Sequence, residues 1–432
     1  MKKALVFGGG VSGKAAAELL RREGAEVTLL DGDVPFPADE YELAVTSPGI
    51  ALDHPWQHAA RERRIPVVSE LQLGAERWRA HGGRMLAVTG SKGKSSVVKL
   101  VADTLTLAGR PAVPCGNYGT PLCAICNSYL PSSPISSPSP SPSSSLSSSI
   151  PYSLSPIHSL PWAVVEVSSF QLETTELPDD AFEAAALLNL QEDHLDRHGS
   201  REVYHALKLR LLAMTRHPID VSEVSASPED SHALFAGSYF DNPILSANGF
   251  AAVKLLRAAG LDDAALAAGF AAFVPLPHRM QEVCVRDGVR FIDDSKATSI
   301  AALCAGITMA TAKNAGFDGH GNELSIDRRQ SKCLLIAGGL AKGDDPKIAF
   351  TPLQCGVKKV YLIGSCAQQL QEAWSGVVPC EMCGTLENAV AAARRDAVSG
   401  DAVLLSPGTA SFDQFQSYNE RGAAFAALAE KE

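Results

Sequence analysis

The segment Thr89-Gly90-Ser91-Lys92-Gly93-Lys94-Ser95-Ser96 constrains the fold of this chain more than any other feature. It follows an apolar stretch, Met85–Thr89, that predicts a strand, and it precedes Ser95–Ala108, which predicts a helix. Glycines allow backbone N–H groups to face phosphate oxygens, the helix N-terminus adds positive potential, and Lys94 can reach the terminal phosphates. Ser95 or Ser96 can coordinate Mg²⁺. The spacing differs from the Walker pattern, since Gly90 lies three positions before Gly93 instead of five, and a plain glycine turn is the alternative. The flanking strand and helix favour a phosphate loop in an α/β fold.

The N-terminus contains a second glycine-rich turn. Lys2–Phe7 predicts a strand, Gly8–Gly13 fits G-x-G-x-x-G, Lys14–Arg22 predicts a helix, and a strand over Glu26–Leu30 ends before Asp31. Asp31 lies 18 residues beyond Gly13, a spacing that suits a carboxylate on a ribose hydroxyl. Alone, this motif would suggest NAD or FAD. Because a phosphate loop follows downstream, we favour a nucleotide diphosphate that belongs to a substrate, with a redox cofactor as the alternative.

Polar clusters follow two further predicted strands, Ala163–Val167 and Ala184–Leu188. Glu166 lies at the carboxyl edge of the first, where α/β sheets bind ligands, and five ionisable side chains crowd residues 193–198 after the second. Phosphoryl transfer requires Mg²⁺ and positive charge around the phosphates. We therefore predict that Glu166 and His194 lie near the metal and that Lys208, on a helix over Glu202–Met214, lies close by. A solvated charged loop is the alternative.

A length of 432 residues and alternating strand and helix patterns predict three α/β domains. We expect a Rossmann-like domain at 1–82, a mononucleotide-binding P-loop domain at 83–276, and a Rossmann-like domain at 277–432. Residues 127–161 are dominated by Ser and Pro, without Asp, Glu, Lys or Arg, and predict a flexible surface insertion. Residues 313–332 are polar and predict a loop. In the third domain the predicted elements are strands at Val289–Ile292, Cys333–Ala337, Lys359–Ile363 and Ala402–Leu405 and a helix at Thr385–Asp396.

Composition excludes several classes of protein. A net charge of −10 argues against general binding to nucleic acids or acidic lipids. No apolar run approaches the ~18 residues of a membrane span, and the apolar run near the N-terminus ends at Gly8, too early for a signal peptide, so a cytoplasmic protein is expected. The ten cysteines include two CxxC pairs, Cys123/Cys126 and Cys380/Cys383. Buried small side chains are the preferred interpretation over a metal or redox site.

Eight segments, in this order, carry a resemblance that covers nearly the whole chain: TSPGIAL (46–52), TGSKGKSS (89–96), CGNYG (115–119), EVSSFQLE (166–173), NLQEDHLDRHG (189–199), PHRM (277–280), DDSKATS (293–299) and LLSPGTASFDQF (404–415). With them the chain resembles the Mur ligases of peptidoglycan synthesis. The DDSKATS and SPGTASFDQF segments resemble most closely the members that add D-glutamate.

The resemblance implies specific site residues. UDP-contacting positions are matched by Val11, Ser12, Asp31, Ser47 and Asn117. ATP-contacting positions are matched by Gly90, Ser91, Lys92, Gly93, Lys94, Ser95, Ser96, Asn248, Arg279 and Asp294. Magnesium positions are matched by Ser95, Glu166, His194 and Lys208, where Lys208 is the lysine that the family carbamylates. Positions around D-glutamate are matched by Thr298, Lys342, Ser411, Phe412 and Tyr418, while Lys296 is expected near the phosphates.

The implied activity is an ATP-dependent amide ligation with two Mg²⁺ ions, catalysed by Lys94, His194, Lys208 and Lys296. The substrates would be UDP-N-acetylmuramoyl-L-alanine and D-glutamate, joined through an acyl phosphate, and a monomer is expected. Two departures concern nucleotide contacts: the stretch between Asp31 and Ser47 is shorter than the family's, and Asn242-Pro243 replaces a His-Asn pair. The alternatives are a different Mur-type or folylpolyglutamate-type ligase, a homologue that binds without catalysis, and a nicotinamide-binding protein.

Overall fold

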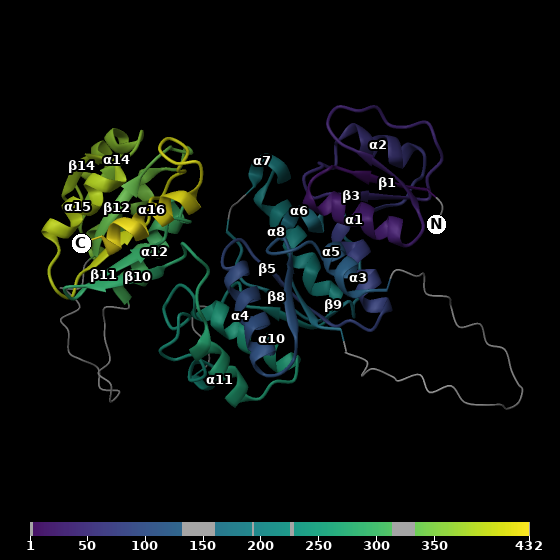
Figure 1. Ribbon diagram of the computed structural model, residues 1–432, viewed down its shortest axis with the longest axis horizontal. Coiled ribbons are helices and arrows are strands. Elements are labelled where there is room, and N and C mark those ends of the chain that lie inside the picture. Colours follow the sequence, from purple (N-terminus) through teal and green to yellow (C-terminus); the bar gives the residue numbers. More distant parts are fainter. Residues whose placement is uncertain (1–2, 132–159, 192–193, 225–228, 313–332, 432) are drawn as a thin grey trace, which may run out of the picture. The chain divides into compact units, whose positions relative to one another are not determined.

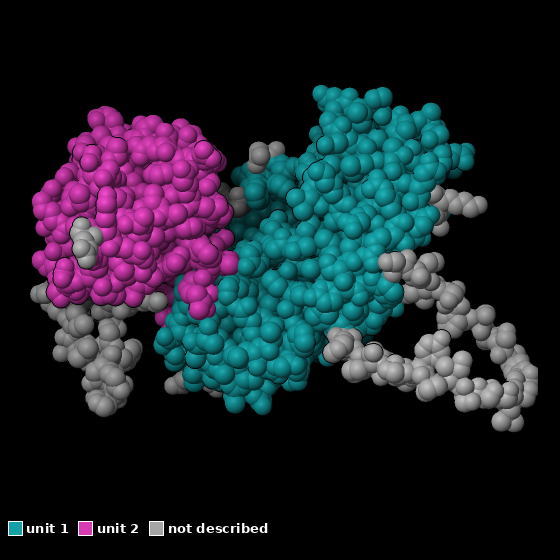
Figure 2. All heavy atoms as spheres, viewed as in Figure 1, with its two compact units in different colours: residues 1–240, 247–273 teal, residues 241–246, 274–432 magenta. Residues whose placement is uncertain are grey.

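The computed structural model describes residues 3–131, 160–191, 194–224, 229–312 and 333–431. Three separate sheets, each with helices against it, account for the α/β class expected from the sequence (Figure 1). The described chain divides into two compact units, coloured separately in Figure 2: residues 1–240 with 247–273, and residues 241–246 with 274–432. Among the described helices, none combines the length and apolarity needed to cross a membrane.

The first sheet is parallel throughout, in the order β2-β1-β3-β4. Its strands are β1 (Lys3–Phe7), β2 (Glu26–Leu30), β3 (Leu43–Thr46) and β4 (Val67–Ser69), and its helices are α1 (Val11–Arg22), α2 (Pro55–Glu62) and α3 (Glu70–Ala80). Helix α1 begins three residues earlier than predicted, so Gly13 lies inside it. A Cβ on Gly13 would stand 1.8 Å from the Gly8 carbonyl oxygen, and this crossing requires glycine.

The second sheet is also parallel, in the order β6-β7-β5-β8-β9. Its strands are β5 (Met85–Thr89), β6 (Ala112–Gly116), β7 (Trp162–Glu166), β8 (Phe182–Leu187) and β9 (Thr215–Asp220). The accompanying helices are α4 (Lys94–Leu107), α5 (Leu122–Tyr129), α6 (Ser169–Leu172), α7 (Leu195–His198), α8 (Arg201–Leu209), the 3₁₀ helix η1 (Arg210–Met214), α9 (Glu229–His232), α10 (Ser246–Ala258) and α11 (Asp263–Ala272). The helix predicted over Glu202–Met214 is therefore two elements, α8 and η1.

The predicted Ser/Pro insertion begins later than residue 127. Asn127 to Tyr129 complete α5, and the Asn127 side chain donates to the Ala15 carbonyl at 3.0 Å. Leu130 is buried, which fixes the chain after α5 against the core. Residues 132–159 lie outside the described residues, as do 313–332.

The first two sheets share one hydrophobic core, so they form a single compact unit. Helices α1, α3 and α5 contact one another between the sheets (Figure 1). The core joins Leu71 and Trp78 of α3 to Leu122 of α5 and Phe182 of β8. The hydrophobic core therefore continues across the domain boundary predicted at residue 82. The boundary itself stays a prediction.

The third sheet has the order β10-β11-β15-β12-β13-β14, and it is parallel except for β10, which pairs antiparallel with β11. Its strands are β10 (Gln281–Arg286), β11 (Val289–Asp293), β12 (Cys333–Gly338), β13 (Val357–Ile363), β14 (Cys380–Gly384) and β15 (Ala402–Leu405). Its helices are α12 (Ile300–Ala312), the 3₁₀ helix η2 (Pro346–Ala349), α13 (Phe350–Gly356), α14 (Ala367–Trp374), α15 (Leu386–Asp396) and α16 (Tyr418–Glu430). Apolar side chains cover both faces of this sheet.

Candidate active site

The phosphate loop lies between β5 and α4, as the sequence predicts. Gly90 and Gly93 adopt positive φ angles of 147° and 84° that favour glycine. A Cβ on Gly93 would stand 2.2 Å from Asn248 Nδ2, so Asn248 of α10 packs directly against the loop. Asn248, 155 positions from Gly93 in the chain, therefore lies at the phosphate loop, and its contact with ATP stays a prediction.

Two lysines meet at one carbonyl of this loop. Lys94 Nζ donates to the Gly90 oxygen at 2.8 Å and to the Ser91 oxygen at 3.1 Å. Lys208 Nζ, on α8, donates to the same Gly90 oxygen at 3.0 Å. Lys208 is 2% exposed and lies 4.7 Å from the centre of the Tyr204 ring. Two ammonium groups therefore converge where a bound phosphate chain would carry negative charge.

The loop is braced by residues that the sequence interpretation did not single out. Lys92 N donates to Asn189 Oδ1 at 2.8 Å, and Asn189 Nδ2 donates to the Lys92 oxygen at 3.0 Å. Tyr204 Oη donates to Ser91 Oγ at 3.0 Å, and Ser91 Oγ in turn donates to the Gln191 oxygen. Tyr204 precedes Lys208 by one helical turn, and this i,i+4 spacing is the signal that could have identified it.

Glu166 and Asn117 lie together at the carboxyl ends of β7 and β6. Asn117 Nδ2 donates to Glu166 Oε1 at 2.7 Å, and Val88 of β5 pairs with Glu166 in the register of the sheet. Glu166 is 2% exposed, and its Oε2 atom has no hydrogen-bond partner among the described residues. A buried carboxylate oxygen without a donor is costly unless a cation satisfies it. Glu166 therefore fits the predicted role of magnesium ligand.

His194 stands directly before α7, with a φ of 54°, and its ring lies 4.9 Å from that of Phe170 and 6.3 Å from that of Tyr204. In the described part of the chain, no group of three or more His, Cys, Asp or Glu side chains converges as a metal site. Mg²⁺ commonly binds through one or two protein carboxylates together with water and substrate phosphates. Glu166 fits a site of that kind, and the assignment of His194 and Ser95 to magnesium stays a prediction.

The glycine turn of the first sheet contains the residues matched to UDP contacts. Gly9 N donates to Asp31 Oδ1 at 3.0 Å, and Ser47 Oγ donates to the Gly8 oxygen at 3.2 Å. Val11 is 75% exposed at the start of α1, followed by Ser12. Asp31 thus holds the backbone of the turn in addition to any contact with a ribose.

In the unit built on the third sheet, the predicted residues form two pairs. Lys342 Nζ donates to Thr298 Oγ1 at 3.3 Å, and Lys296 Nζ lies 3.8 Å from the centre of the Tyr418 ring. Ser411 is buried, and the neighbouring Phe412 is exposed.

Asp294 directly follows β11 and is buried. Burial raises its pKa to about 7, more than the hydrogen bond from Ser406 lowers it. Ser406 Oγ donates to Asp294 Oδ2 at 2.9 Å, and Met280 N donates to Oδ1 at 3.3 Å. Arg279 adjoins Met280 and is partly exposed. The carboxylate of Asp294 is therefore already engaged by the protein.

Arg421 of α16 is a further residue that the motifs do not reveal. It is 1% exposed, and its guanidinium donates to Ser295 Oγ at 3.0 Å and to the Thr409 oxygen at 3.2 Å. It thereby joins the segment 293–299 to the segment 404–415, which lie more than 100 positions apart in the sequence. Burial lowers the pKa of Arg421 to about 10.

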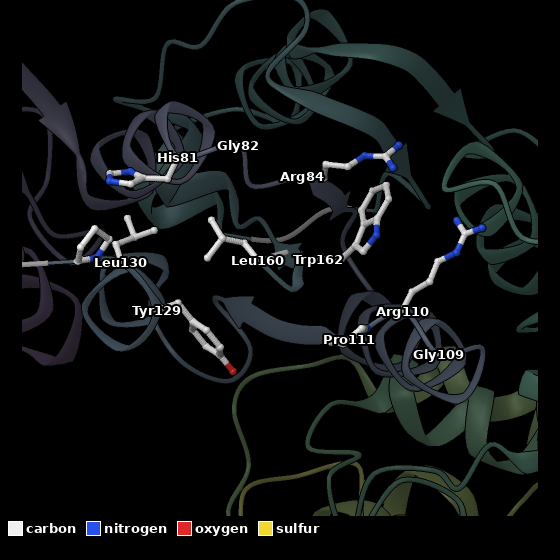
Figure 3. Close-up of a pocket in the computed structure, with 11 residues that line it drawn as sticks. His81, Gly82, Arg84, Gly109, Arg110, Pro111, Tyr129, Leu130, Leu160 and Trp162 are labelled. Atoms are coloured by element: carbon white, nitrogen blue, oxygen red, sulfur yellow. The ribbon is translucent and has the colours of Figure 1, made fainter. Parts of the chain in front are cut away.

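A cavity of about 490 Å³ lies at the amino ends of the strands of the second sheet, opposite the carboxyl ends that carry the phosphate loop (Figure 3). Its walls include Arg84, Arg110 and Trp162, which precede or begin β5, β6 and β7, and Arg84 Cζ lies 3.9 Å from the centre of the Trp162 ring. In parallel strands the amino and carboxyl ends are at opposite edges, so this cavity is separate from the phosphate loop.

In the described part of the chain, the cysteines do not gather with histidines or carboxylates into a group of three or more that could hold a metal ion. All ten are free; Cys123 and Cys126 are buried, and burial raises the pKa of the Cys123 thiol well above its usual value. Cys380 and Cys383 are partly exposed on β14, and Cys355 is exposed, so the expectation of buried cysteines is correct for only part of the set.

Comparison with known proteins decides the family. Residues 88–222 match the Mur ligase middle domain family, and they include the phosphate loop, Glu166, His194 and Lys208. The UDP-N-acetylmuramoylalanine–D-glutamate ligase of Chlamydia abortus is 30% identical over 99% of this chain and 97% of its own length, and that of Rubrobacter xylanophilus is 32% identical over 99% and 98%. This chain belongs to the UDP-N-acetylmuramoylalanine–D-glutamate ligase family. It is an ATP-dependent ligase of the Mur type.

Solved structures support the family's fold. Superposition on the UDP-N-acetylmuramate-alanine ligase MurC of Thermotoga maritima covers 100% of both chains, with a TM-score of 0.55 and 15% identity. The MurF ligase of Thermotoga maritima in complex with ADP covers 90% of this chain and 94% of its own, with a TM-score of 0.51 and 13% identity. At these identities the likeness concerns the fold alone.

Proposed function

We propose that this chain joins D-glutamate to the alanyl carboxylate of UDP-N-acetylmuramoyl-L-alanine at the expense of ATP. The observation that carries the proposal is the convergence of Lys94 and Lys208 on the Gly90 carbonyl, next to the strand that ends at the incompletely satisfied carboxylate of Glu166. Phosphoryl transfer requires positive charge, which Lys94 would supply, and a cation site, to which Glu166 and, after carbamylation, Lys208 would contribute. The relatives' names supply the identity of the two substrates.

The reaction consists of two displacements. An oxygen of the alanyl carboxylate attacks the γ-phosphorus of ATP, the bond to ADP breaks, and an acyl phosphate forms. The amine of D-glutamate then attacks the acyl carbon, phosphate leaves with the C–O bond electrons, and the amine loses a proton. Lys94 stabilises the charge that develops on the phosphate oxygens, and the backbone N–H groups at the N-terminus of α4 orient them.

Several site roles belong to this proposal. Glu166, His194 and Ser95 would hold Mg²⁺, which would neutralise phosphate charge when bound. Lys208 would be carbamylated: CO₂ adds to its neutral amine, a proton leaves, and a buried cation becomes an anionic ligand. Lys296, Thr298, Lys342, Ser411, Phe412 and Tyr418 would surround D-glutamate and the departing phosphate, while Arg279 and Asp294 would contact ATP.

The first sheet would hold the UDP group through Val11, Ser12, Asp31 and Ser47, with Asn117 contributing from the second sheet. The corresponding domains would be 1–82, 83–276 and 277–432. We also propose that the protein works as a cytoplasmic monomer on these small molecules.

An amino-acid panel tests the substrate assignment. Purified protein is given UDP-N-acetylmuramoyl-L-alanine, ATP and Mg²⁺, and phosphate release is measured with D-glutamate, L-glutamate, L-alanine or a diamino acid. We expect release with D-glutamate and loss of release when any component is omitted. Release with another amino acid but not with D-glutamate would instead establish a different Mur-type ligase.

A further inference from the structure

Arg197, on the short helix α7, forms a two-pronged ion pair with Glu173, which follows α6. Its Nε atom donates to Glu173 Oε1 at 3.0 Å, and Nη2 donates to Oε2 at 2.6 Å. The side chains of Arg197 and Glu173 are 16% and 5% exposed. A fork of this kind fixes the orientation of the guanidinium as well as its position.

The same guanidinium also reaches the first sheet. Nη2 of Arg197 donates to the Ile50 oxygen at 3.0 Å, and the Pro48 oxygen lies 3.4 Å away. This loop follows β3, and it is attached to the glycine turn, because Ser47 Oγ donates to the Gly8 oxygen and Ile50 N donates to the Ser47 oxygen. Arg197 therefore connects α7 to the glycine turn through one short loop.

At its other end, α7 determines the position of His194. His198, on the same helix, lies 3.0 Å from Ser169 Oγ through Nε2 and 3.3 Å from Glu173 Oε1 through Nδ1. Phe170 contacts both Arg197 and His194: Arg197 Cζ and the centre of the His194 ring each lie 4.9 Å from the centre of the Phe170 ring. Arg197 and His198 together tie the helix that follows His194 to α6.

We propose that Arg197 is a positioning residue. It couples the glycine turn of the first sheet to His194, which would hold magnesium beside the phosphate loop. A ligand that settles against the glycine turn fixes the Pro48–Ile50 loop, the loop fixes Arg197, and Arg197 fixes α7 with His194. Because coupling between two sites is reciprocal, binding of the magnesium–nucleotide complex also strengthens binding at the glycine turn. The inference rests on the proposed function, which supplies the two ligands.

Calorimetry with two probes tests this coupling without turnover. The dissociation constant of the non-hydrolysable ATP analogue AMPPNP with Mg²⁺ is measured with and without saturating UDP-N-acetylmuramoyl-L-alanine. In the native protein we expect the second ligand to tighten binding at least about fivefold, the lower end of typical couplings. In Arg197→Ala we expect that ratio to fall to near one, while each ligand alone binds within about threefold of the native constant.

Two further variants make the result decisive. Arg197→Lys keeps the charge but cannot contact Glu173 and the loop carbonyls together, so its ratio should also be near one, and it decides the question if Arg197→Ala does not fold. Arg84→Ala is the matched control, because Arg84 also combines an ion pair (with Glu183) and an aromatic contact, but at the opposite edge of the sheet, and it should keep the native ratio.

A native ratio of one, a native-like ratio in the Arg197 variants, or an equal loss in Arg84→Ala would each overturn the coupling. The proposed function fails separately, when native protein releases no phosphate with D-glutamate. An active native enzyme whose Arg197 variants keep the coupling would refute the positioning role alone.

Discussion

The Gly90 carbonyl oxygen accepts hydrogen bonds from two lysines, Lys94 at the start of α4 and Lys208 on α8. Lys94 follows from the local motif, because the geometry of a phosphate loop is encoded in consecutive residues. Lys208 follows from its helix after the charged segment 193–198 and from the resemblance, but nothing near it in sequence indicates that its ammonium will reach a carbonyl 118 positions away. Contacts of that range depend on how strands are ordered in the sheet, which local patterns do not specify.

Replacement of Lys94 tests the charge that this loop supplies. Lys94→Ala should lower the rate of phosphate release by about 100- to 1000-fold, as when a charge-stabilising donor is lost, while the circular dichroism spectrum stays native. Lys99→Ala is the control, because Lys99 lies on the same helix but pairs with Asp103, and it should stay within about twofold of native. A Lys94 variant as active as Lys99→Ala would remove the phosphate-loop role.

Replacement of Lys208 tests the carbamate. Lys208→Ala should lose most activity, and added short carboxylates such as acetate or formate should restore part of it by placing an anion in the vacated space. The same salts should leave native activity unchanged. Absence of any rescue, together with a Lys208 peptide of unmodified mass in the native protein, would argue against the modification.

At the scale of elements, α3 and α5 carry a buried acid at their contact. Glu70 is 1% exposed; Cys123 N donates to its Oε1 at 2.7 Å, and its Oε2 has no hydrogen-bond partner among the described residues. Burial raises the pKa of Glu70 from 4.5 to about 7, more than the hydrogen bond from Cys123 lowers it. Between about pH 4.5 and 7, the folded protein therefore keeps a proton on Glu70 that the unfolded chain has already released.

This proton makes the free energy of unfolding depend on pH. The contribution of Glu70 is absent below about pH 4.5, becomes increasingly unfavourable as the pH rises to about 7, and is constant above that. Glu70→Gln should remove this decline, so its advantage over the native protein should grow by up to about 3 kcal/mol across the window. Denaturant unfolding at several pH values measures it; Glu76→Gln, at a more exposed position on α3, should follow the native curve, and parallel curves for Glu70→Gln would contradict the prediction.

The sequence predicts most of the strands that are continuous apolar runs, whereas it misses the edge strands β9 and β14 and the short inner strand β3. Strands β5 and β12 are continuous apolar runs covered on both faces, and their patterns are unambiguous. By contrast β9, with the sequence TRHPID, and β14, with CEMCG, lie at sheet edges and have mixed exposure, so no apolar pattern identifies them. Helix α1 begins earlier than predicted because the glycine turn continues into it: Gly13, where close contact with the Gly8 carbonyl oxygen requires glycine, lies inside the helix.

For the whole molecule, the sequence indicated the α/β class and three sheets, but not how compact units form from them. The first two sheets share a hydrophobic core through α3 and α5, because the apolar faces of these two helices pack together. No linker-like segment in the sequence marks or excludes this contact. The site was predicted where consecutive residues carry it, in the phosphate loop and the glycine turn. The supports at Asn189, Tyr204 and Arg421 were missed, because each joins segments far apart in the chain.

Isotope transfer tests the central claim, that a carboxylate is activated as an acyl phosphate. UDP-N-acetylmuramoyl-L-alanine labelled with ¹⁸O in the alanyl carboxylate is converted with D-glutamate, ATP and Mg²⁺, and the released phosphate is examined by mass spectrometry. The proposed chemistry predicts one ¹⁸O atom in each phosphate, because the attacking carboxylate oxygen leaves with phosphorus when the amide forms. Phosphate without the label, accompanied by amide product, would contradict it.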